Sequence, residues 1–188
     1  EVLATMKRLD GHPDIEFVFV GEGPQKARIE AFADRHALSN FRYLPYFPRE
    51  DLTHSLPMAD VHLMTLREEM AGIAVPGKLY GIMAAGRPAL MVGPEASEPG
   101  ETIQISGAGR VVDPSQTDTP AQALHDTLLS LYRDDALRTE LGRNGREAFL
   151  EHFEREVCCR KWASLFGRRL NGGSEVGASP QKEAVVGS

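Results

Sequence analysis

The segment "GIAVPGKLYGIMAAGRPALMV", residues 72–92, contains both kinds of element from which the fold is built. Apolar residues at i, i+3 and i+4 predict a helix over about 76–85. Gly86 follows as a helix stop, and the apolar run 88–92 predicts a strand that is buried on both faces. A helix that leads directly into a buried strand is typical of a parallel sheet with helical crossovers.

The same alternation continues on both sides of this segment. Apolar runs predict strands over 15–20, 40–44, 60–65, 88–92 and 109–113. Periodic segments predict helices over 1–9, 25–37, 48–56, 76–85, 119–134, 135–153 and 155–170. Strands that alternate with helices indicate right-handed βαβ units. We therefore predict an α/β fold with a Rossmann-like parallel sheet, helices on both faces, and additional helices at the C-terminus.

Size and composition narrow the class of protein. The chain has 188 residues, of which 41% are hydrophobic, and this predicts one domain with a sizeable core. The net charge of −6 argues against a nucleic-acid partner bound through a basic face. Cys158 and Cys159 are adjacent and lack metal-ligand spacing, which favours a reduced, cytoplasmic setting. No apolar run reaches the ~20 residues of a membrane span.

The two ends of the sequence differ in character. The chain begins at Glu1 within the first predicted helix, so we expect a preceding strand that lies outside this sequence. The predicted domain covers residues 1–170. From Asn171 onward the sequence is rich in glycine and serine and lacks periodicity, so 171–188 is predicted to be a disordered tail.

The loops that follow the predicted strands are the candidate site, because ligands of open parallel sheets bind beyond the carboxyl ends of the strands. These loops are "GEGP" (21–24), "PYFP" (45–48), "LREEMAGIAVPGK" (66–78) and "GPEASEPGET" (93–102). The first loop does not match G-x-G-x-x-G, so the dinucleotide fingerprint is not met. Its glycines permit a close backbone approach to a ligand, or simply a turn between strand and helix.

The 66–78 loop is longer than most connections in compact domains, and such loops are often functional. Gly72 and Gly77 leave room for a ligand, and Lys78 places a positive charge beside the free N–H groups of the next helix. We interpret this loop as an anion site. The alternative is an ordinary helix start with a solvated lysine.

Groups for acid–base or metal chemistry are sparse. Glu98 and Glu101 offer carboxylates to ribose or sugar hydroxyls, or are simply solvated. No serine elbow, cysteine–histidine pair or metal-ligand cluster is evident, and His62 lies inside a predicted strand as a structural residue. Catalytic residues are therefore unknown, no metal is predicted, and the expected chemistry is a transfer assisted by electrostatic positioning.

Five segments in a fixed order resemble a known family. They are "FVFVGEGPQKARIE", "NFRYLPYFPREDL", "MADVHLMTL", "GIAVPGKLYGIMAAGRPAL" and "SGAGRVVDP". Over about residues 1–166 they resemble the nucleotide-sugar-binding, C-terminal half of the retaining GT-B glycosyltransferases of the group-1 family. "VPGKLYGIMAAGRP" is similar to bacterial enzymes that build exopolysaccharide, capsule or O-antigen. The resemblance implies a first strand with a glycine-rich turn, and an acceptor-holding N-terminal domain, both preceding this sequence.

The resemblance also implies a donor site for a UDP- or GDP-sugar, with no cofactor. The implied residues are Gly21, Gly23 and Pro24 along the nucleotide cleft, Pro45, Tyr46 and Phe47 beside the base, and Gly72, Ile73, Ala74, Gly77 and Lys78 at the distal phosphate and sugar. The implied reaction transfers the sugar, with retention, to a glycan or lipid-linked acceptor in cell-surface polysaccharide synthesis. The donor's own phosphate would accept the proton of the acceptor.

This sequence departs from the family at two positions. The family usually has two glutamates separated by seven residues, and the second holds the ribose. Here those positions are Ile73 and Gly81. We predict that Glu98 or Glu101 supplies the ribose contact instead.

Two other functions remain open. One is a sugar-nucleotide epimerase of GT-B type, which usually needs acidic and histidine groups near the sugar. The other is a non-catalytic nucleotide-sugar-binding module, which the absence of both family glutamates favours. The basic helix at 155–170 carries Trp162, Leu165 and Phe166. We expect this helix to pack on the N-terminal domain of the whole protein, and peripheral contact with an anionic membrane is the alternative.

Overall fold

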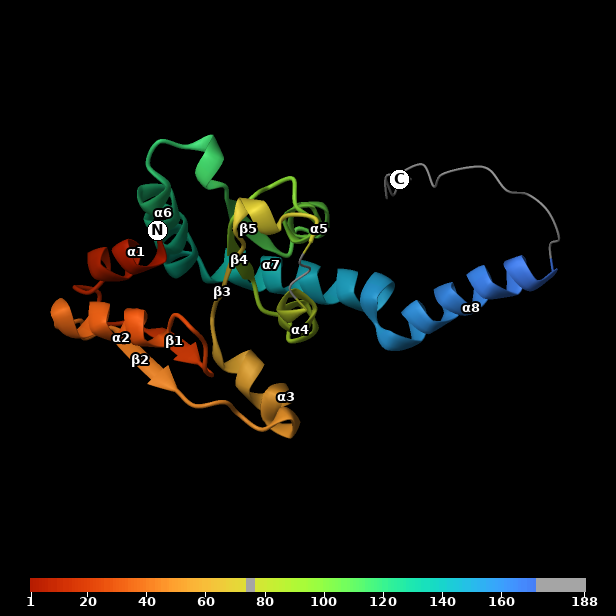
Figure 1. Cartoon of the computed structure of the whole chain (residues 1–188), viewed down its shortest axis with the longest axis horizontal. Helices are drawn as coiled ribbons and strands as arrows, with labels where there is room; N and C mark the ends of the chain where they lie inside the picture. The colour runs from red at the N-terminus through yellow and green to blue at the C-terminus, as the bar shows by residue number, and fades with distance from the viewer. Residues whose placement is uncertain (74–76, 172–188) are drawn as a thin grey trace.

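The structure, a computed structural model, describes residues 1–73 and 77–171, with side chains described as far as Phe166 in the last helix. The predicted tail beyond Asn171 and the predicted site residue Ala74 lie outside the described residues. Figure 1 shows a compact body from which the C-terminal helix extends.

Helices and strands alternate through the first two thirds of the chain, as predicted. The strands are β1 (Phe17–Val20), β2 (Phe41–Leu44), β3 (His62–Thr65), β4 (Ala89–Val92) and β5 (Gly109–Val112). The helices are α1 (Val2–Arg8), α2 (Lys26–Arg35), α3 (Leu52–Ser55), α4 (Lys78–Ala84), α5 (Glu98–Ser106), α6 (Pro120–Arg133), α7 (Asp135–Ala148) and α8 (Arg155–Asn171). A π-helical turn, η5 (Phe149–Phe153), joins α7 to α8.

The five strands form two parallel sheets rather than the single sheet that we expected. β1 pairs with β2, and β3, β4 and β5 form the second sheet in that order. Within the described residues, no strand pairing joins β1 to β3. The α/β class, the parallel strands and the flanking helices are confirmed, but one edge of β1 and one edge of β3 have no strand neighbour in that part of the chain.

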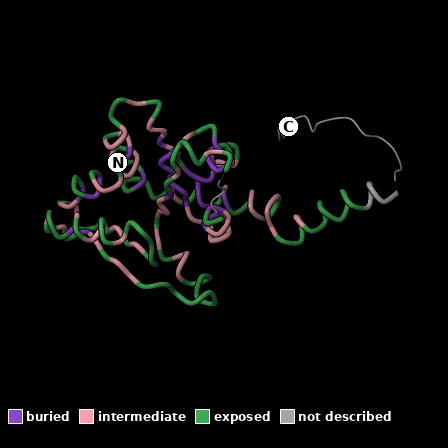
Figure 2. The backbone as a smooth tube through the Cα atoms, in the orientation of Figure 1, coloured by how far each residue is buried: buried purple, intermediate pink, exposed green. Residues whose placement is uncertain are grey.

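The three-stranded sheet carries the core of the molecule. All four residues of β4 are buried. On one face of the sheet, Met91 packs with apolar residues of α4 and α5, and on the other face Leu90 packs with apolar residues of α6 and α7. Because both faces are covered, β4 is continuously apolar rather than alternating. Purple buried segments gather around this sheet in Figure 2.

The two-stranded sheet is much less buried. β1 alternates between half-buried and exposed residues, and Val18 and Val20 are 46% and 47% exposed. The half-buried side chains form an aromatic cluster, in which the Phe19 ring stacks on Tyr43 at 6.1 Å and lies 5.7 Å from Phe41. This sheet therefore depends on one small cluster and on α2.

Two helix predictions need correction. The 93–102 segment was expected to be a loop, but α5 begins at Glu98, with Ser97 as its N-cap and Gly107 as a left-handed stop. The Ser97 Oγ accepts a hydrogen bond from the Gly100 N–H, as N-cap residues do. The helix expected over 48–56 is instead a 3-10 turn (Arg49–Asp51), the short α3 and a second 3-10 turn (Leu56–Met58). Pro57 has no N–H for the next helical hydrogen bond, which accounts for the end of α3.

The 72–92 segment folds as expected within the residues that the structure describes. α4 buries Leu79, Ile82 and Met83. Gly86 has a left-handed φ of 67°, which ends the helix and lets Pro88 lead into β4. The helix starts at Lys78, and residues 74–76 lie outside the described ranges.

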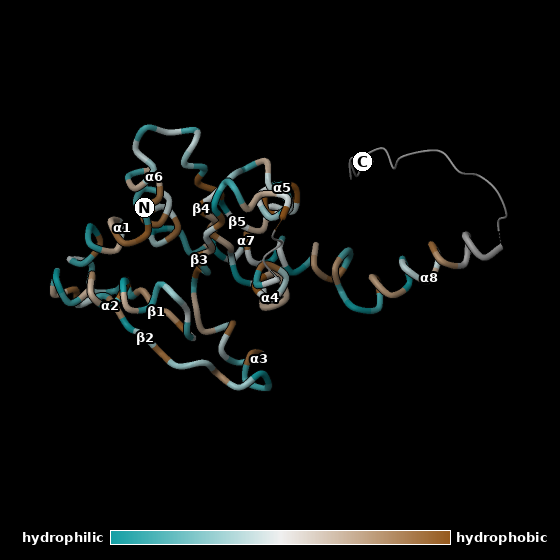
Figure 3. The backbone as a smooth tube through the Cα atoms, in the orientation of Figure 1, coloured by the Kyte–Doolittle hydropathy of each residue, from teal (hydrophilic) through white to brown (hydrophobic). Residues whose placement is uncertain are grey.

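α8 leaves the body with much of its surface uncovered. Trp162, Leu165 and Phe166 are 62%, 55% and 58% exposed. Figure 3 shows hydrophobic and hydrophilic residues alternating along this helix. Within the described ranges, every helix is too short or too polar to span a bilayer.

Candidate functional site

The turns after β1 and β2 meet at the carboxyl end of the small sheet. Gly21 has a φ of 110°, and its N–H donates to the Leu44 carbonyl at 3.0 Å. The Tyr46 ring covers Gly21 so closely that a Cβ at Gly21 would lie 2.4 Å from Tyr46 Cε1. The Tyr46 hydroxyl donates to the Glu22 carbonyl at 3.1 Å. The structure thus brings together two loops that were predicted separately as parts of one site.

The remaining predicted residues of these two turns face solvent. Gly23, Pro24 and Pro45 are exposed, and Phe47 is 37% exposed. Tyr46 is itself 67% exposed although it rests on Gly21. An aromatic ring held by one hydrogen bond and open on its other face is suited to stacking on a planar group.

The loop after β3 is anchored at its start and open farther along. The Leu66 N–H donates to the Val92 carbonyl at 3.0 Å, and a short 3-10 turn follows over Glu68–Met70. Gly72 has a positive φ of 77°, and Ile73 is 76% exposed. The predicted contribution of Ala74 lies outside the described residues.

The anion-site interpretation expected the ammonium group of Lys78 beside the free N–H groups at the start of α4. The structure places this group elsewhere. Its Nζ donates to the Leu63 carbonyl at 3.1 Å, on the unpaired side of β3. A cleft of about 270 Å³ lies there, lined by Leu63, Met64, Thr65 and Lys78. Partial burial lowers the pKa of Lys78 below its ordinary value. The Gly77 at the helix N-cap is exposed.

Glu98 is held by a tyrosine that the sequence did not single out. The Tyr80 hydroxyl donates to Glu98 Oε1 at 2.6 Å, and the Tyr80 ring lies 4.8 Å from Phe153. Burial, and then the hydrogen bond to Glu98, raise the pKa of Tyr80 well above its ordinary value. Glu101 lies one turn farther along α5 and is exposed.

Gly81, where the family has its ribose-binding glutamate, and Glu98, the predicted replacement, lie on different sides of α4. A Cβ added at Gly81 would lie 3.3 Å from Leu56 Cδ1, so Gly81 faces the segment that precedes β3. Tyr80 and its partner Glu98 face η5 instead. Successive helical residues point about 100° apart, which accounts for this separation. The structure does not bring Glu98 to the face of Gly81.

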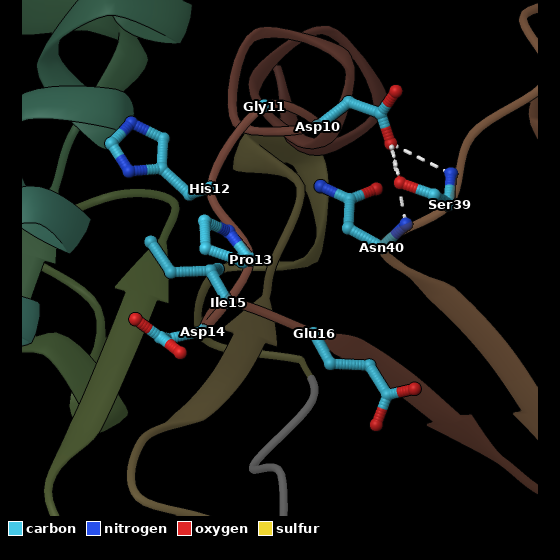
Figure 4. Close-up of a pocket in the computed structure, with 9 residues that line it drawn as sticks. All are labelled: Asp10, Gly11, His12, Pro13, Asp14, Ile15, Glu16, Ser39 and Asn40. Carbon is cyan, nitrogen blue, oxygen red and sulfur yellow. Dashed lines mark hydrogen bonds between the residues drawn. The ribbon is translucent and has the colours of Figure 1, made fainter.

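A second cleft lies at the opposite, amino ends of β1 and β2. It has a volume of about 510 Å³ and is lined by residues 10–16 with Ser39 and Asn40 (Figure 4). Asp10 Oδ1 accepts hydrogen bonds from the Ser39 N–H at 2.7 Å and the Asn40 N–H at 3.2 Å. These bonds tie two chain turns together and lower the pKa of Asp10. Because this cleft lies at the amino ends of the strands, it is not where a parallel sheet binds its ligand.

His62 is structural, in agreement with its predicted role. Its Nε2 lies 2.8 Å from the Leu56 carbonyl, and burial lowers its pKa. Among the described residues, no group of three or more His, Cys, Asp or Glu side chains is arranged to hold a metal ion.

The parallel strands, the turns at their carboxyl ends and the order of the sequence segments fit one half of the GT-B fold. The sequence matches "Glycosyl transferases group 1" over residues 1–148, and this chain belongs to that family.

Two curated proteins that this chain is similar to are both named as glycosyltransferases. WcaI of Escherichia coli (strain K12), whose name assigns it to glycosyl transfer in colanic acid biosynthesis, is 30% identical over 129 residues, which are 68% of this chain and 31% of WcaI. WbjE of Pseudomonas aeruginosa, named as a glycosyltransferase, is 33% identical over 93 residues, which are 50% of this chain and 23% of WbjE. The chain thus spans less than a third of the curated relatives that it matches here.

Solved structures share the fold. WaaG, a glycosyltransferase involved in lipopolysaccharide biosynthesis, is 20% identical with a TM-score of 0.64, over 92% of this chain and 44% of WaaG. A mutant of S. aureus TarM, crystallised with fondaparinux, alpha-GlcNAc-glycerol and UDP, is 21% identical with a TM-score of 0.68, over 88% of this chain and 31% of TarM. The predicted family and fold class are confirmed.

Proposed function

We propose that this chain is the donor-binding half of an enzyme that moves a sugar from a nucleoside diphosphate sugar to a glycan or lipid-linked acceptor. The observation that carries the proposal is the family membership over residues 1–148, combined with the contact between Gly21 and Tyr46 at the carboxyl end of the small sheet. An open aromatic ring and a glycine with a positive φ are suited to a planar base and a nearby backbone approach.

The whole protein supplies the rest of the site in this proposal. An N-terminal domain holds the acceptor, and a further strand with a glycine-rich turn grips the diphosphate. The share of WcaI that this chain spans, 31%, supports a longer protein. The proposal also keeps the predicted domain boundaries, which are a nucleotide-sugar-binding domain over residues 1–170 and a tail over 171–188. The chain alone is expected to be inactive.

The described residues have defined tasks in this reaction. Tyr46 borders the base, and the backbone near Gly72 and Ile73 approaches the distal phosphate and sugar. The Ile73 N–H donates to the Met70 carbonyl at 3.1 Å in this structure and has to leave it to reach the donor. The main electrostatic task is to stabilise the leaving diphosphate. In this proposal, as the family resemblance implies, the donor's own phosphate accepts the acceptor proton, and the product retains its anomeric configuration.

The biological setting is part of the same proposal. The names of WcaI and WaaG, which refer to colanic acid and lipopolysaccharide, support a role in cell-surface polysaccharide synthesis. The donor is a UDP- or GDP-sugar, and the UDP bound to TarM supports testing UDP-sugars first. We place the protein in the cytoplasm, at the inner face of the membrane when its acceptor is a lipid.

Expression of the full reading frame and a screen of UDP- and GDP-sugars with lipid-linked acceptors tests the proposal. The expected product contains a new glycosidic bond with the anomeric configuration of the donor, as measured by NMR. Interconversion of free sugar nucleotides without acceptor would identify an epimerase instead.

A binding module is the second candidate, and the absence of carboxylates at Ile73 and Gly81 favours it. In that case the full-length protein binds a sugar nucleotide but forms neither a new glycoside nor an epimer. Calorimetry on the same preparation separates this outcome from an unfolded or inactive sample.

A further inference from the structure

The loop that follows β4 lies directly beside the loop that follows β3. The two strands are parallel neighbours, with Thr65 opposite Val92 at their carboxyl ends. A Cβ at Gly93 would lie 2.5 Å from the Leu66 carbonyl oxygen, so the two loops touch through their backbones as they leave the sheet. The loop after β4 and the first turn of α5 therefore belong to the sheet edge at which a parallel sheet binds its ligand.

Contacts on both sides hold the loop after β4 in one conformation. The Glu95 N–H donates to Asp113 Oδ2 at 2.9 Å, and the Ser97 hydroxyl donates to the Pro94 carbonyl at 2.6 Å. A Cβ at Gly100 would lie 2.5 Å from the Glu95 carbonyl oxygen, so the start of α5 packs on this loop. A side chain in the first turn of α5 is thus presented from a well-ordered backbone, as specific binding requires.

Glu98 is the exposed carboxylate of this first turn, and Tyr80 of α4 holds one of its two oxygens. The Tyr80 hydroxyl donates to Glu98 Oε1 at 2.6 Å, and the Tyr80 ring is itself held 4.8 Å from Phe153. Within the described ranges, Tyr80 supplies the hydrogen bond to this carboxylate through Oε1. Oε2 is therefore the oxygen that can accept a hydrogen bond from a ligand.

The chemistry of a carboxylate decides which sugar it can recognise. A carboxylate only accepts hydrogen bonds, and sugar hydroxyl groups donate them. Such bonds to a charged acceptor are stronger than bonds between neutral groups. A second carboxylate, as in a uronic acid, supplies no donor and is repelled by the like charge. The carboxylate of Glu98 therefore fits a neutral sugar with free hydroxyl groups.

The position of Glu98 favours the transferred sugar over the ribose as its partner. Tyr46, which borders the base in the proposed function, follows β2, whereas Glu98 follows β4. In the view of Figure 1, β3 is drawn between β2 and β4. Gly81, at the family's ribose position, faces the segment before β3, and Glu98 lies on the other side of α4. Along the sheet edge, Glu98 is therefore the farther of the two positions from the base.

We propose that Glu98 is a specificity-determining residue of the donor site, that Tyr80 is the positioning residue that holds it, and that the pair selects a neutral sugar over a uronic acid. The Tyr80 hydroxyl holds Oε1, and Oε2 accepts hydrogen bonds from hydroxyl groups of the sugar. This inference rests on the proposed function, because it names the class of sugar that the same site takes.

Calorimetry on the full-length protein tests the selection. The probes are UDP-glucose with UDP-glucuronate, and GDP-mannose with GDP-mannuronate. For the nucleotide that is bound, the neutral member of the pair is expected to bind at least about tenfold more tightly than the uronate. Glu98→Gln keeps the shape of the side chain and removes its charge, so the preference is expected to fall below about threefold. A preference that Glu98→Gln leaves unchanged contradicts the role of Glu98.

Tyr80→Phe tests the positioning role, because it removes the hydroxyl group and keeps the ring on Phe153. The Kd of the neutral sugar nucleotide is expected to rise about fivefold, whereas the Kd of UDP or GDP alone stays the same. In a Glu98→Ala background, Tyr80→Phe is expected to have no further effect, since Tyr80 acts only through Glu98. A merely structural role would give the same loss in both backgrounds and would weaken binding of the bare nucleotide as well.

The pair Tyr132 and Asp14 provides matched control variants away from this edge of the sheet. The Tyr132 hydroxyl donates to Asp14 Oδ2 at 3.1 Å, beside the cleft at the amino ends of β1 and β2. Tyr132→Phe and Asp14→Asn remove the same chemical groups as the test variants. Both are expected to leave the Kd of every probe unchanged, and a change equal to that of Tyr80→Phe would contradict the positioning role.

The outcomes separate this inference from the proposed function. A full-length protein that binds UDP or GDP but does not prefer the neutral sugar nucleotide overturns the inference and leaves the proposed function intact. A wild-type protein that binds neither the nucleotides nor their sugar conjugates overturns the proposed function, and the inference with it.

Discussion

The two sheets of this molecule differ in how far their side chains are buried. In the three-stranded sheet, every residue of β4 is buried between helices, and Leu90 has no exposed surface. In the two-stranded sheet, Val18 and Val20 remain nearly half exposed, and single contacts such as that between Gly21 and Tyr46 fix the turns. The larger sheet therefore supplies most of the stability, whereas the smaller sheet supplies turns of the candidate site.

The largest effect is expected from a matched pair of truncations. Leu90→Ala removes a fully buried side chain and is expected to lower the free energy of unfolding by about 3 kcal/mol. Val18→Ala on the exposed strand is expected to cost less than about 1 kcal/mol. Urea unfolding of both variants measures the difference. Comparable losses would show that the two sheets contribute equally to stability.

A glycine substitution tests whether a single contact fixes the smaller sheet. Gly21→Ala places a methyl group against the Tyr46 ring at a φ of 110°, and we expect a loss of about 2 kcal/mol. Gly23→Ala is the control, because no atom lies within 4 Å of the added Cβ. Thermal unfolding of the pair checks this, and a Tm that falls equally in both variants would assign the effect to the loop rather than to the contact.

The N-caps of α5 and α6 provide a smaller, local test. The Ser97 Oγ accepts a hydrogen bond from the Gly100 N–H, so Ser97→Ala is expected to cost about 1 kcal/mol. Thr119 stands at the N-cap of α6 without a side-chain cap bond, and Thr119→Ala is expected to cost much less. Equal losses in denaturant unfolding would argue against a role for the Ser97 cap in stability.

The smallest effect is expected in the pH dependence of thermal stability, through His62 in the edge strand β3. Burial lowers the pKa of His62 below its ordinary value of 6.5, so the unfolded chain binds this proton more readily than the folded chain. The contribution of neutral His62 is therefore fully present above about pH 6.5 and is lost as the pH falls from there through the folded pKa. His62→Gln is expected to flatten the Tm–pH profile between pH 7 and 5. An unchanged profile would assign this pH dependence to other groups.

Local patterns predicted the elements well where period and stop signals agreed. Leu79, Ile82 and Met83 marked the buried face of α4, and Gly86 marked its end. α5 was missed because Pro99 and Gly100 resemble loop residues. Pro99 lies in the first turn of the helix, where its missing N–H costs little. Gly100 is needed because a Cβ would lie 2.5 Å from the Glu95 carbonyl oxygen, which is a tertiary constraint.

Local sequence patterns did not predict the contacts between elements that shape the site. The sequence places Glu98 after a strand, but it does not reveal that Tyr80 reaches across from α4 to hold it. Similarly, Lys78 was predicted from its position at a helix start, whereas its ammonium group lies on a carbonyl of β3. Both contacts depend on how helices pack on the sheet. The predicted contacts of the site residues with a donor remain predictions.

The extended position of α8 has a practical consequence. Trp162 is the single tryptophan of the sequence, and it lies 62% exposed with its ring stacked 5.8 Å from Phe166. Indole emission shifts to shorter wavelength when water is removed from the ring. The protein thus contains its own optical reporter, and its fluorescence spectrum will register whatever comes to cover this helix, without any added label.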